Sequence, residues 1–190
     1  MSDHIEDKHF DRIDFATEPL AGESFEACTF TGCDFTEVRL DERVFIDTTF
    51  TNCNLSNAKV GGSGFRDVFF DRCKLIGVDF SSANDTIISF RFTDCILDYV
   101  SFARLPLKKT EFVNCSLIRA FFDDADLSSS KFDNCNLENA VFGKTNLEKT
   151  DLSTSYNYTI DPSNNRIKKA KFSINGLPGL LSEYDITIVA

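Results

Sequence analysis

Seven cysteines are the side chains of this sequence with the widest chemistry, because a thiol can form a disulfide, bind a soft metal or act as a nucleophile. The only histidines are His4 and His9, near the N-terminus, so no Cys/His pair on a rigid element is available for catalysis. The odd cysteine count and the lack of an export signal favour free thiols. We interpret the cysteines as small buried apolar residues, with metal ligands or disulfides as the alternatives.

Six of these cysteines are evenly placed, which indicates a repeating structure. They lie 20, 20, 22, 20 and 20 residues apart, at Cys33, Cys53, Cys73, Cys95, Cys115 and Cys135. Every fifth residue of the chain is also large and apolar, from Phe10 to Phe80 and, after a slip of two residues, from Ile87 to Leu152. A period of five fits neither a helix nor a strand, so a different backbone must be repeating.

The cysteines lie two residues before the large apolar positions, where the chain otherwise places mostly Ala, Ser or Thr. A spacing of twenty residues corresponds to four pentads, so we expect a coil with four sides that returns above itself. Such coils lie about 4.8 Å apart, and about seven of them would build a rod roughly 34 Å long. Large and small inward residues would together fill its narrow interior. The sequence therefore predicts an all-β solenoid.

Several pentads resemble the pentapeptide-repeat consensus, Ala-(Asp/Asn)-Leu-x-x. Examples are Cys53-Asn-Leu-Ser-Asn, Ala125-Asp-Leu-Ser-Ser, Cys135-Asn-Leu-Glu-Asn and Thr150-Asp-Leu-Ser-Thr. The resemblance covers about residues 8 to 155 and implies a right-handed quadrilateral β-helix. We divide the chain into an N-terminal arm (1–9), a repeat region (10–155) with a two-residue insertion near 81–91, and a C-terminal segment (156–190).

The C-terminal segment carries a narrower resemblance. Tyr156-Asn-Tyr-Thr-Ile-Asp-Pro, with the later stretches that begin at Arg166 and Leu180, is similar to the tail of the gyrase-interacting group. That group comprises the albicidin-immunity, microcin B-immunity and Qnr quinolone-resistance proteins. The resemblance implies a DNA-mimicking partner of DNA gyrase or a related type II topoisomerase that counters a poison and forms a homodimer through its C-terminus. The candidate interface residues are Leu177, Leu180, Leu181, Tyr184, Ile186 and Ile188.

We also expect the C-terminal segment to cover the open end of the solenoid, because a last coil exposes apolar side chains and unpaired backbone. The stretch that starts at Leu177 predicts a short helix, in whose first turn Pro178 is tolerated. Residues 185–190 alternate like an edge strand. The predicted fold is thus the β-helix with a short helix and strand as its cap.

Negative charge is concentrated at one end of the chain. The formal net charge is −10, and residues 1–47 contribute −9 through 13 acidic and 4 basic residues. Such a surface suits a basic partner protein and repels nucleic acid; the alternative is that the charges only keep the protein soluble. A DNA mimic would carry acids along the whole rod, so this uneven charge departs from the family. The candidate partner-binding acids are Asp11, Asp14, Glu18, Glu23, Glu26, Asp34, Glu37, Asp41 and Glu42.

The slip near residues 81–91 predicts a small loop, with Ser82, Asn84 and Asp85 as candidate contact residues. A structural insertion without function is the alternative, since solenoids tolerate loops. We expect no enzyme activity, no cofactor and no bound metal. The polar N-terminus and the lack of a long apolar run favour a cytoplasmic protein with no membrane segment. The competing function is a scaffold for another basic protein that is not a topoisomerase.

Overall fold

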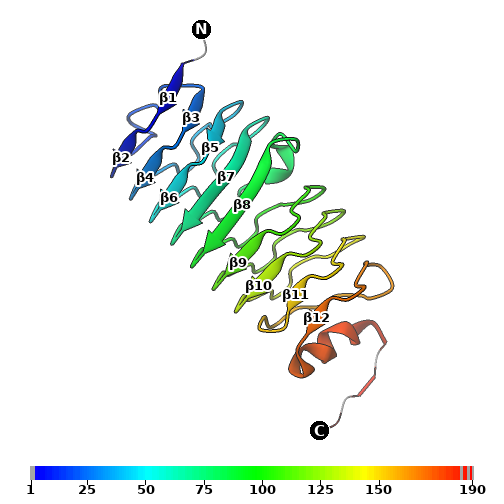
Figure 1. The fold of residues 1–190 in the computed structure, drawn as a ribbon. Helices are drawn as coiled ribbons and strands as arrows, with labels where there is room; N and C mark the ends of the chain where they lie inside the picture. The colour runs from blue at the N-terminus through cyan, green and yellow to red at the C-terminus, as the bar shows by residue number, and fades with distance from the viewer. Residues whose placement is uncertain (1–2, 185, 188, 190) are drawn as a thin grey trace.

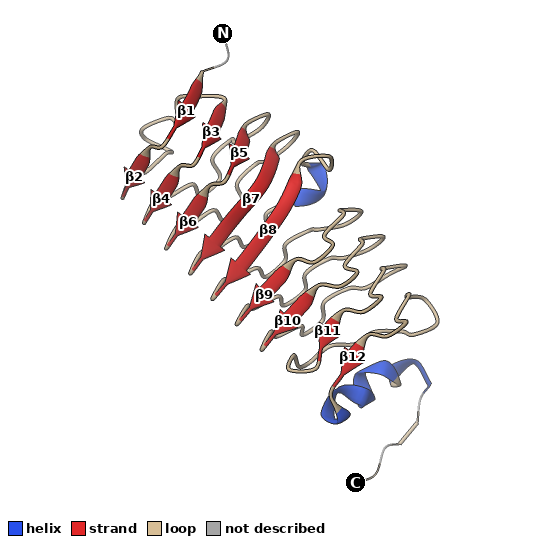
Figure 2. Ribbon diagram, viewed as in Figure 1, coloured by secondary structure: helices blue, strands red, loops and turns tan. Residues whose placement is uncertain are grey.

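The computed structural model describes residues 3–184, 186–187 and 189, which wind into a straight β-solenoid of about eight turns. Figure 1 shows the two termini at opposite ends of the rod, and Figure 2 shows short strands joined by tight turns. The predicted all-β solenoid is confirmed, with slightly more turns than the seven expected. The strands are β1 (His4–Glu6), β2 (His9–Asp11), β3 (Ser24–Glu26), β4 (Thr29–Thr31), β5 (Val44–Ile46), β6 (Thr49–Thr51), β7 (Gly64–Asp71), β8 (Ile88–Thr93), β9 (Glu111–Val113), β10 (Lys131–Asp133), β11 (Asp151–Leu152) and β12 (Lys171–Phe172).

All strand pairs are parallel, and each turn pairs with the next twenty residues on, except across the slip. The first side of the rod carries β1, β3, β5 and the start of β7, and the second side carries the ladder from β2 to β12. The third and fourth sides have isolated bridges, such as Asp14 to Asp34 and Phe121 to Val141. β1 lies within the segment expected to be an arm, and it already pairs with β3.

The interior is filled by columns of side chains of one kind. On the second side, seven phenyl rings from Phe10 to Phe132 stack with centroids 4.5 to 5.3 Å apart. Rings from neighbouring sides meet them edge-on, as Phe35 meets Phe50 at 70°. Stacked and edge-on pairs add to the stability that burial of the rings provides. The pentad's large apolar residue is therefore the element that holds successive turns together.

Where Asp or Asn precedes the large apolar residue, its side chain shapes the turn. Asp34 Oδ1 accepts hydrogen bonds from the backbone N–H and the hydroxyl of Thr36, and Asn54 Oδ1 does the same for Ser56. Such Asx turns satisfy backbone donors that the corner leaves unpaired. Two residues after the apolar residue the backbone enters the left-handed region, even at Ala27 (φ 50°). The corner at Gly61 and Gly62 follows this pattern, since Gly62 has φ 68°.

The slip changes the register in two steps. Phe65 pairs with Ile88, 23 residues on, whereas Val68 pairs with Phe90, 22 residues on. A loop inserts three residues, and a β-bulge then removes one. Ile87, expected in the core, is therefore only half-buried, and the ring of Phe90 lies between those of Phe65 and Phe80 at 5.5 and 5.0 Å. A large residue in the small-residue position thus fills the space that the slip leaves.

Two short 3-10 helices, η2 (Ile174–Leu180) and η3 (Ser182–Tyr184), follow the last strand at the C-terminal end of the rod. They confirm the helical part of the cap. Among the described residues of the expected strand over 185–190, namely 186–187 and 189, none is in a strand. Within the part of the chain that the structure describes, no helix is long and apolar enough to span a membrane.

Candidate partner-binding surfaces

The nine candidate acidic residues encircle the N-terminal end of the rod, and we name them the acidic collar. Glu26 lies on the first side, Asp11 on the second, and Asp14 and Asp34 stack on the third. Asp41 lies near the fourth-side bridge from Arg39 to Lys59. Seven of the nine are exposed, and Glu26 and Asp41 are half-buried. The collar therefore offers negative charge in every direction around the rod rather than along one face.

About half of the collar is already engaged within the protein. Asp14 and Asp34 each hold an Asx turn, and Asp41 accepts the N–H of Gly61 at 2.9 Å. Asp11 pairs with Arg12 at 3.0 Å, and Glu26 lies 3.7 Å from His4. These five residues support local structure as well as carrying charge.

The other four collar side chains make no hydrogen bond or ion pair among the residues that the structure describes. They are Glu18, Glu23, Glu37 and Glu42, and all four are exposed. These carboxylates are the part of the collar that a basic partner could engage without first breaking an internal contact.

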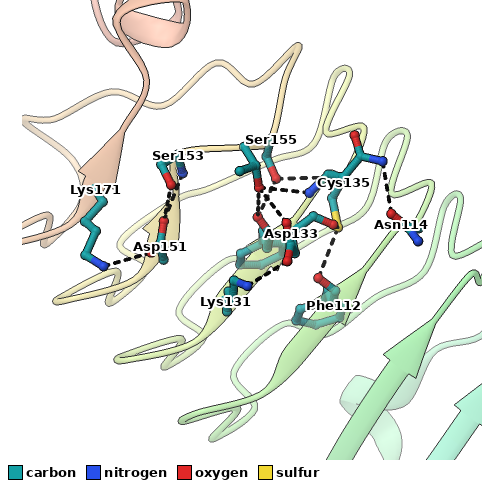
Figure 3. Close-up of polar contacts among 12 residues, drawn as sticks. Phe112, Asn114, Lys131, Asp133, Cys135, Asp151, Ser153, Ser155 and Lys171 are labelled. Atoms are coloured by element: carbon teal, nitrogen blue, oxygen red, sulfur yellow. Dashed lines mark hydrogen bonds and ion pairs between the residues drawn. The ribbon is translucent and has the colours of Figure 1, made fainter.

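The second side of the later turns carries a different charge pattern. Arg91, Glu111, Lys131, Asp151 and Lys171 follow one another in register, with alternating sign. Arg91 lies 3.2 Å from Glu111, and Lys171 lies 2.9 Å from Asp151, as Figure 3 shows for the second pair. Hydrogen bonds from Ser153 and Lys171 lower the pKa of Asp151 to about 2. This face neutralises itself, so it does not present phosphate-like charge.

This alternating ladder was not predicted from the sequence. Its signal was available, because the five residues recur every twenty positions directly before the large apolar residue. Charges of opposite sign that face each other on adjacent strands stabilise the pair.

The cysteines are core residues. All seven are free and at most 2% exposed. Their Sγ–H groups donate to backbone carbonyls, as Cys135 does to Phe112 at 3.4 Å in Figure 3. The neighbouring thiol of Cys115 and burial raise the pKa of Cys95 to about 12. Among the described residues, no group of three or more His, Cys, Asp or Glu side chains could hold a metal ion. The thiols are therefore inaccessible to solvent, as packing residues are.

The loop at the slip is short and closed by its own hydrogen bonds. The 3-10 helix η1 (Phe80–Ser82) begins it, and Ser82 donates to the carbonyl of Asp79 at 2.8 Å. Asn84 Oδ1 accepts from Thr86, so this side chain is used within the loop. Ser82 and Asp85 are exposed and Asn84 is half-buried. Of the three predicted contact residues, only Ser82 and Asp85 are exposed enough to contact a partner.

The C-terminal cap divides its apolar residues between two tasks. Leu180, expected at a dimer interface, is 8% exposed and packs against the core, so its role is to close the solenoid. The N–H of Ile160 donates to the carbonyl of Gly179 at 2.9 Å, which ties the cap to the last turn. Ile188 lies outside the described residues. The exposed residues form what we name the tail patch: Ile174, Leu177, Leu181, Tyr184, Ile186 and Val189. Ile174 and Val189 were not predicted.

Comparison with known proteins agrees with this architecture. A model of the pentapeptide repeat region matches residues 23–91, and a model of eight copies of the pentapeptide repeat matches residues 122–155. No curated protein matches the sequence. Two trypsin-treated variants of QnrB1, described as a plasmid-mediated fluoroquinolone resistance protein, align at 22% identity with TM-scores of 0.65 and 0.63. They cover all of this chain and 99% and 100% of their own.

Full-length QnrB1 aligns at 20% identity with a TM-score of 0.55, over 95% of this chain and 99% of its own. At these identities the likeness shows a shared fold, and it extends from one end of the rod to the other. Both matches to the family models lie within the solenoid, in the region of the five-residue repeat. The chain therefore belongs to the pentapeptide-repeat family and resembles its Qnr members.

Proposed function

We propose that this protein is a non-enzymatic DNA mimic that binds DNA gyrase, or another type II topoisomerase, in the cytoplasm and protects it from a quinolone or a peptide toxin. The observation that carries the proposal is the end-to-end likeness to QnrB1, a fluoroquinolone resistance protein. The tail resemblance to the gyrase-interacting group supports it. Neither the binding nor the protection requires a bond to be made or broken.

The acidic collar supports a mechanism of competition for a basic surface. A topoisomerase holds DNA on a positively charged surface, and carboxylates attract such a surface as phosphates do. The four free carboxylates, at Glu18, Glu23, Glu37 and Glu42, supply this charge. The loop residues Ser82 and Asp85 are secondary contact candidates. The protein would enter the enzyme with its N-terminal end and displace DNA or destabilise the poisoned complex.

The tail patch supports a homodimer. Exposed apolar residues that cluster at one end of a rod mark an interaction site, and Ile174 and Tyr184 are 85% and 57% exposed. A second copy that meets the first at this end would form a symmetric pair and double the length of the rod. The collars would then lie at the two far ends.

A scaffold for a different basic protein is the second candidate function. The charge distribution favours it, because the second side of the later turns is neutralised by its alternating ladder. A uniform DNA imitation would leave such acids unpaired along the whole rod.

The test is a DNA supercoiling assay with gyrase and a quinolone. We expect micromolar protein to restore supercoiling, and a Glu23→Lys/Glu37→Lys variant to need about tenfold more protein. An Asp124→Lys/Glu138→Lys variant is the matched control, since both residues are exposed acids in later turns. It should protect like the unmodified protein.

Failure to restore supercoiling against any of several gyrase poisons would reject the topoisomerase role in favour of the scaffold. Restoration that the Glu23 and Glu37 changes leave intact would keep that role but exclude the collar from it. Thermal unfolding of both variants is measured first, so that a loss of protection is not a loss of fold.

A further inference from the structure

One corner of the rod forms a straight edge from end to end, between the first and the second side. Its residues lie two positions after the large apolar residue of the first side, and in every turn but the last their N–H groups donate to the next turn. Asp7 N–H donates to Glu26 O at 3.0 Å, and Lys149 N–H donates to Lys168 O at 3.0 Å. We name this column the corner edge: Asp7, Ala27, Asp47, Asp67, Lys109, Ser129, Lys149 and Lys169.

The corner edge reverses its charge at the slip. Before the slip it carries three aspartates, and after the slip it carries three lysines. All eight residues are exposed, and all have the left-handed backbone of a corner, so their side chains project outward from one line. Asp67 and Lys109 border one shallow hollow of about 220 Å³ with Ser89, which marks the level where the sign changes.

The charges of the corner edge are not neutralised within the protein. Among the described residues, none of the three aspartates or the three lysines forms an ion pair. The neighbouring position adds charge of the same sign at Glu6 and Glu26 before the slip and at Lys168 near the C-terminal end, whereas Glu148, beside Lys149, has the opposite sign and pairs with Arg166 at 2.8 Å. Arg66, beside Asp67, reduces the negative half without cancelling it.

We propose that a second copy of this chain docks along the corner edge in the antiparallel direction. A two-fold axis at the level of Ser89 places Asp67 of one copy opposite Lys109 of the other. The turns are about 4.8 Å apart, and Asp7 and Lys169 each lie four turns from that level, so they also face each other. Asp47 then faces Ser129 and Lys149 faces Ala27, so each of these two charges lies one turn away from an opposite charge. Because the contact is two-fold symmetric, each of the two directly facing pairs occurs twice.

The charge pattern selects this occupant and this direction. A polyanion would be attracted to the lysine half but repelled by the aspartate half of the same edge. Two parallel copies would bring two acidic collars together, whereas two antiparallel copies hold the collars at opposite ends. The antiparallel copy is the one occupant that meets both halves with opposite charge. This contact is separate from the proposed topoisomerase role and from the tail patch.

Exposed ion pairs are individually weak, so the association depends on concentration and on salt. We would measure it by analytical ultracentrifugation in a Leu177→Ser/Leu181→Ser background, which removes the tail patch contact. We expect self-association at about 0.05 M salt that weakens at least about tenfold at about 0.5 M salt. A protein that stays monomeric at about 1 mM and low salt would overturn the proposal.

A charge-exchange experiment tests the pairing itself. Lys109→Glu/Lys149→Glu/Lys169→Glu makes the edge wholly negative, and Asp7→Lys/Asp47→Lys/Asp67→Lys makes it wholly positive. Each variant alone should lose self-association, and a mixture of the two should form a heterodimer at least as tight as the original pair. Lys59→Glu/Lys74→Glu/Lys144→Glu is the control, since these exposed lysines lie on other sides and form no ion pair in the described chain.

A mixture that stays monomeric while both variants remain folded would overturn the proposal. So would self-association that the control variant weakens as much as the edge variants do. Retention of the original protein, but not of the lysine variant, on heparin without any self-association would assign the lysines to a polyanion instead.

Discussion

The turns before and after the slip differ in how they are held together. Before β8, two sides of the rod carry strands, and four of the nine collar carboxylates make no hydrogen bond or ion pair within the described chain. After β8, one side carries the strands and its charges alternate from turn to turn. The first side also changes its inward residue from Phe25, Phe45 and Phe65 to leucine. The slip thus separates two parts that are each regular within themselves.

This difference shows how a solenoid divides its tasks. Each turn contacts only its neighbours, so a change in one part is felt mainly there. The ring stack of the second side runs through both parts, but only the earlier turns also stack rings on the first side, and they leave part of their charge available outside. The later turns use part of their charge for their own cohesion. A partner that seeks negative charge would therefore meet the N-terminal end first.

The largest expected effect comes from the ring stack. Phe50 is fully buried between Phe30 and Phe70, at 4.8 and 5.0 Å. Phe50→Ala should lower the free energy of unfolding by about 4 kcal/mol, and Leu147→Ala in the later turns by about 3 kcal/mol. Native-state hydrogen exchange should show that each substitution loosens its own half more. Equal loosening of both halves would show that the rod unfolds as one cooperative unit, and the turns before and after the slip would then not be independent parts.

A smaller effect is expected at the ends of the rod. At the N-terminal end, Lys8 lies 4.9 Å above the ring of Phe10, whereas the C-terminal end is covered by the cap. A Cβ at Gly179 would collide with the backbone carbonyl of Tyr158. Gly179→Ala should therefore release the cap and cost about 2 kcal/mol.

Hydrogen exchange of residues 174–180 measures this release directly. Gly143→Ala is the matched control, because its Cβ would meet the flexible side chain of Asp123 instead of backbone. An intact cap in the Gly179 variant would show that the last turn has more freedom to shift than its contacts indicate.

The solenoid was predictable because one five-residue pattern specifies both the inward side chains and the turn. Asp34 and Asn54 form the same local hydrogen bonds at equivalent positions, so no distant contact is needed. At the slip, only the net insertion of two residues could be predicted from the sequence. The separate loop and bulge, and the use of Phe90 instead of Ile87, depend on which ring fits the space between Phe65 and Phe80.

The candidate surfaces were less predictable. The acidic collar was readable from composition, but the engagement of Asp14 and Asp41 is a property of backbone geometry. In the tail, the same apolar pattern serves two purposes, and only the packed last turn separates buried Leu180 from exposed Leu177. The residues of the corner edge could be found from their spacing along the sequence. That their charges form one continuous line is visible only when all turns are aligned in the structure.

The smallest expected effect comes from the charged ladder of the later turns, at Asp151. Asp151 Oδ1 accepts from the Ser153 hydroxyl at 2.6 Å, and Asp151 Oδ2 accepts from Lys171 at 2.9 Å. These contacts lower the pKa of Asp151 to about 2 in the folded protein, from an ordinary value near 3.8. A lowered folded-state pKa stabilises the fold above the ordinary pKa, and the stabilisation is lost as the pH falls from about 4 toward 2.

Asp151→Asn keeps an acceptor for Ser153 but removes the charge that faces Lys171. It should lower the free energy of unfolding by about 1 kcal/mol at neutral pH and by almost nothing near pH 2, as urea unfolding across that range would show. Asp11→Asn, on the same side of the rod before the slip but directly after the large apolar residue, should change stability by less than about 0.5 kcal/mol, because the Asp11–Arg12 pair is exposed. Equal losses at the two sites would mean that the earlier turns also depend on their charges for cohesion. The collar carboxylates would then be less available to a partner than their exposure indicates.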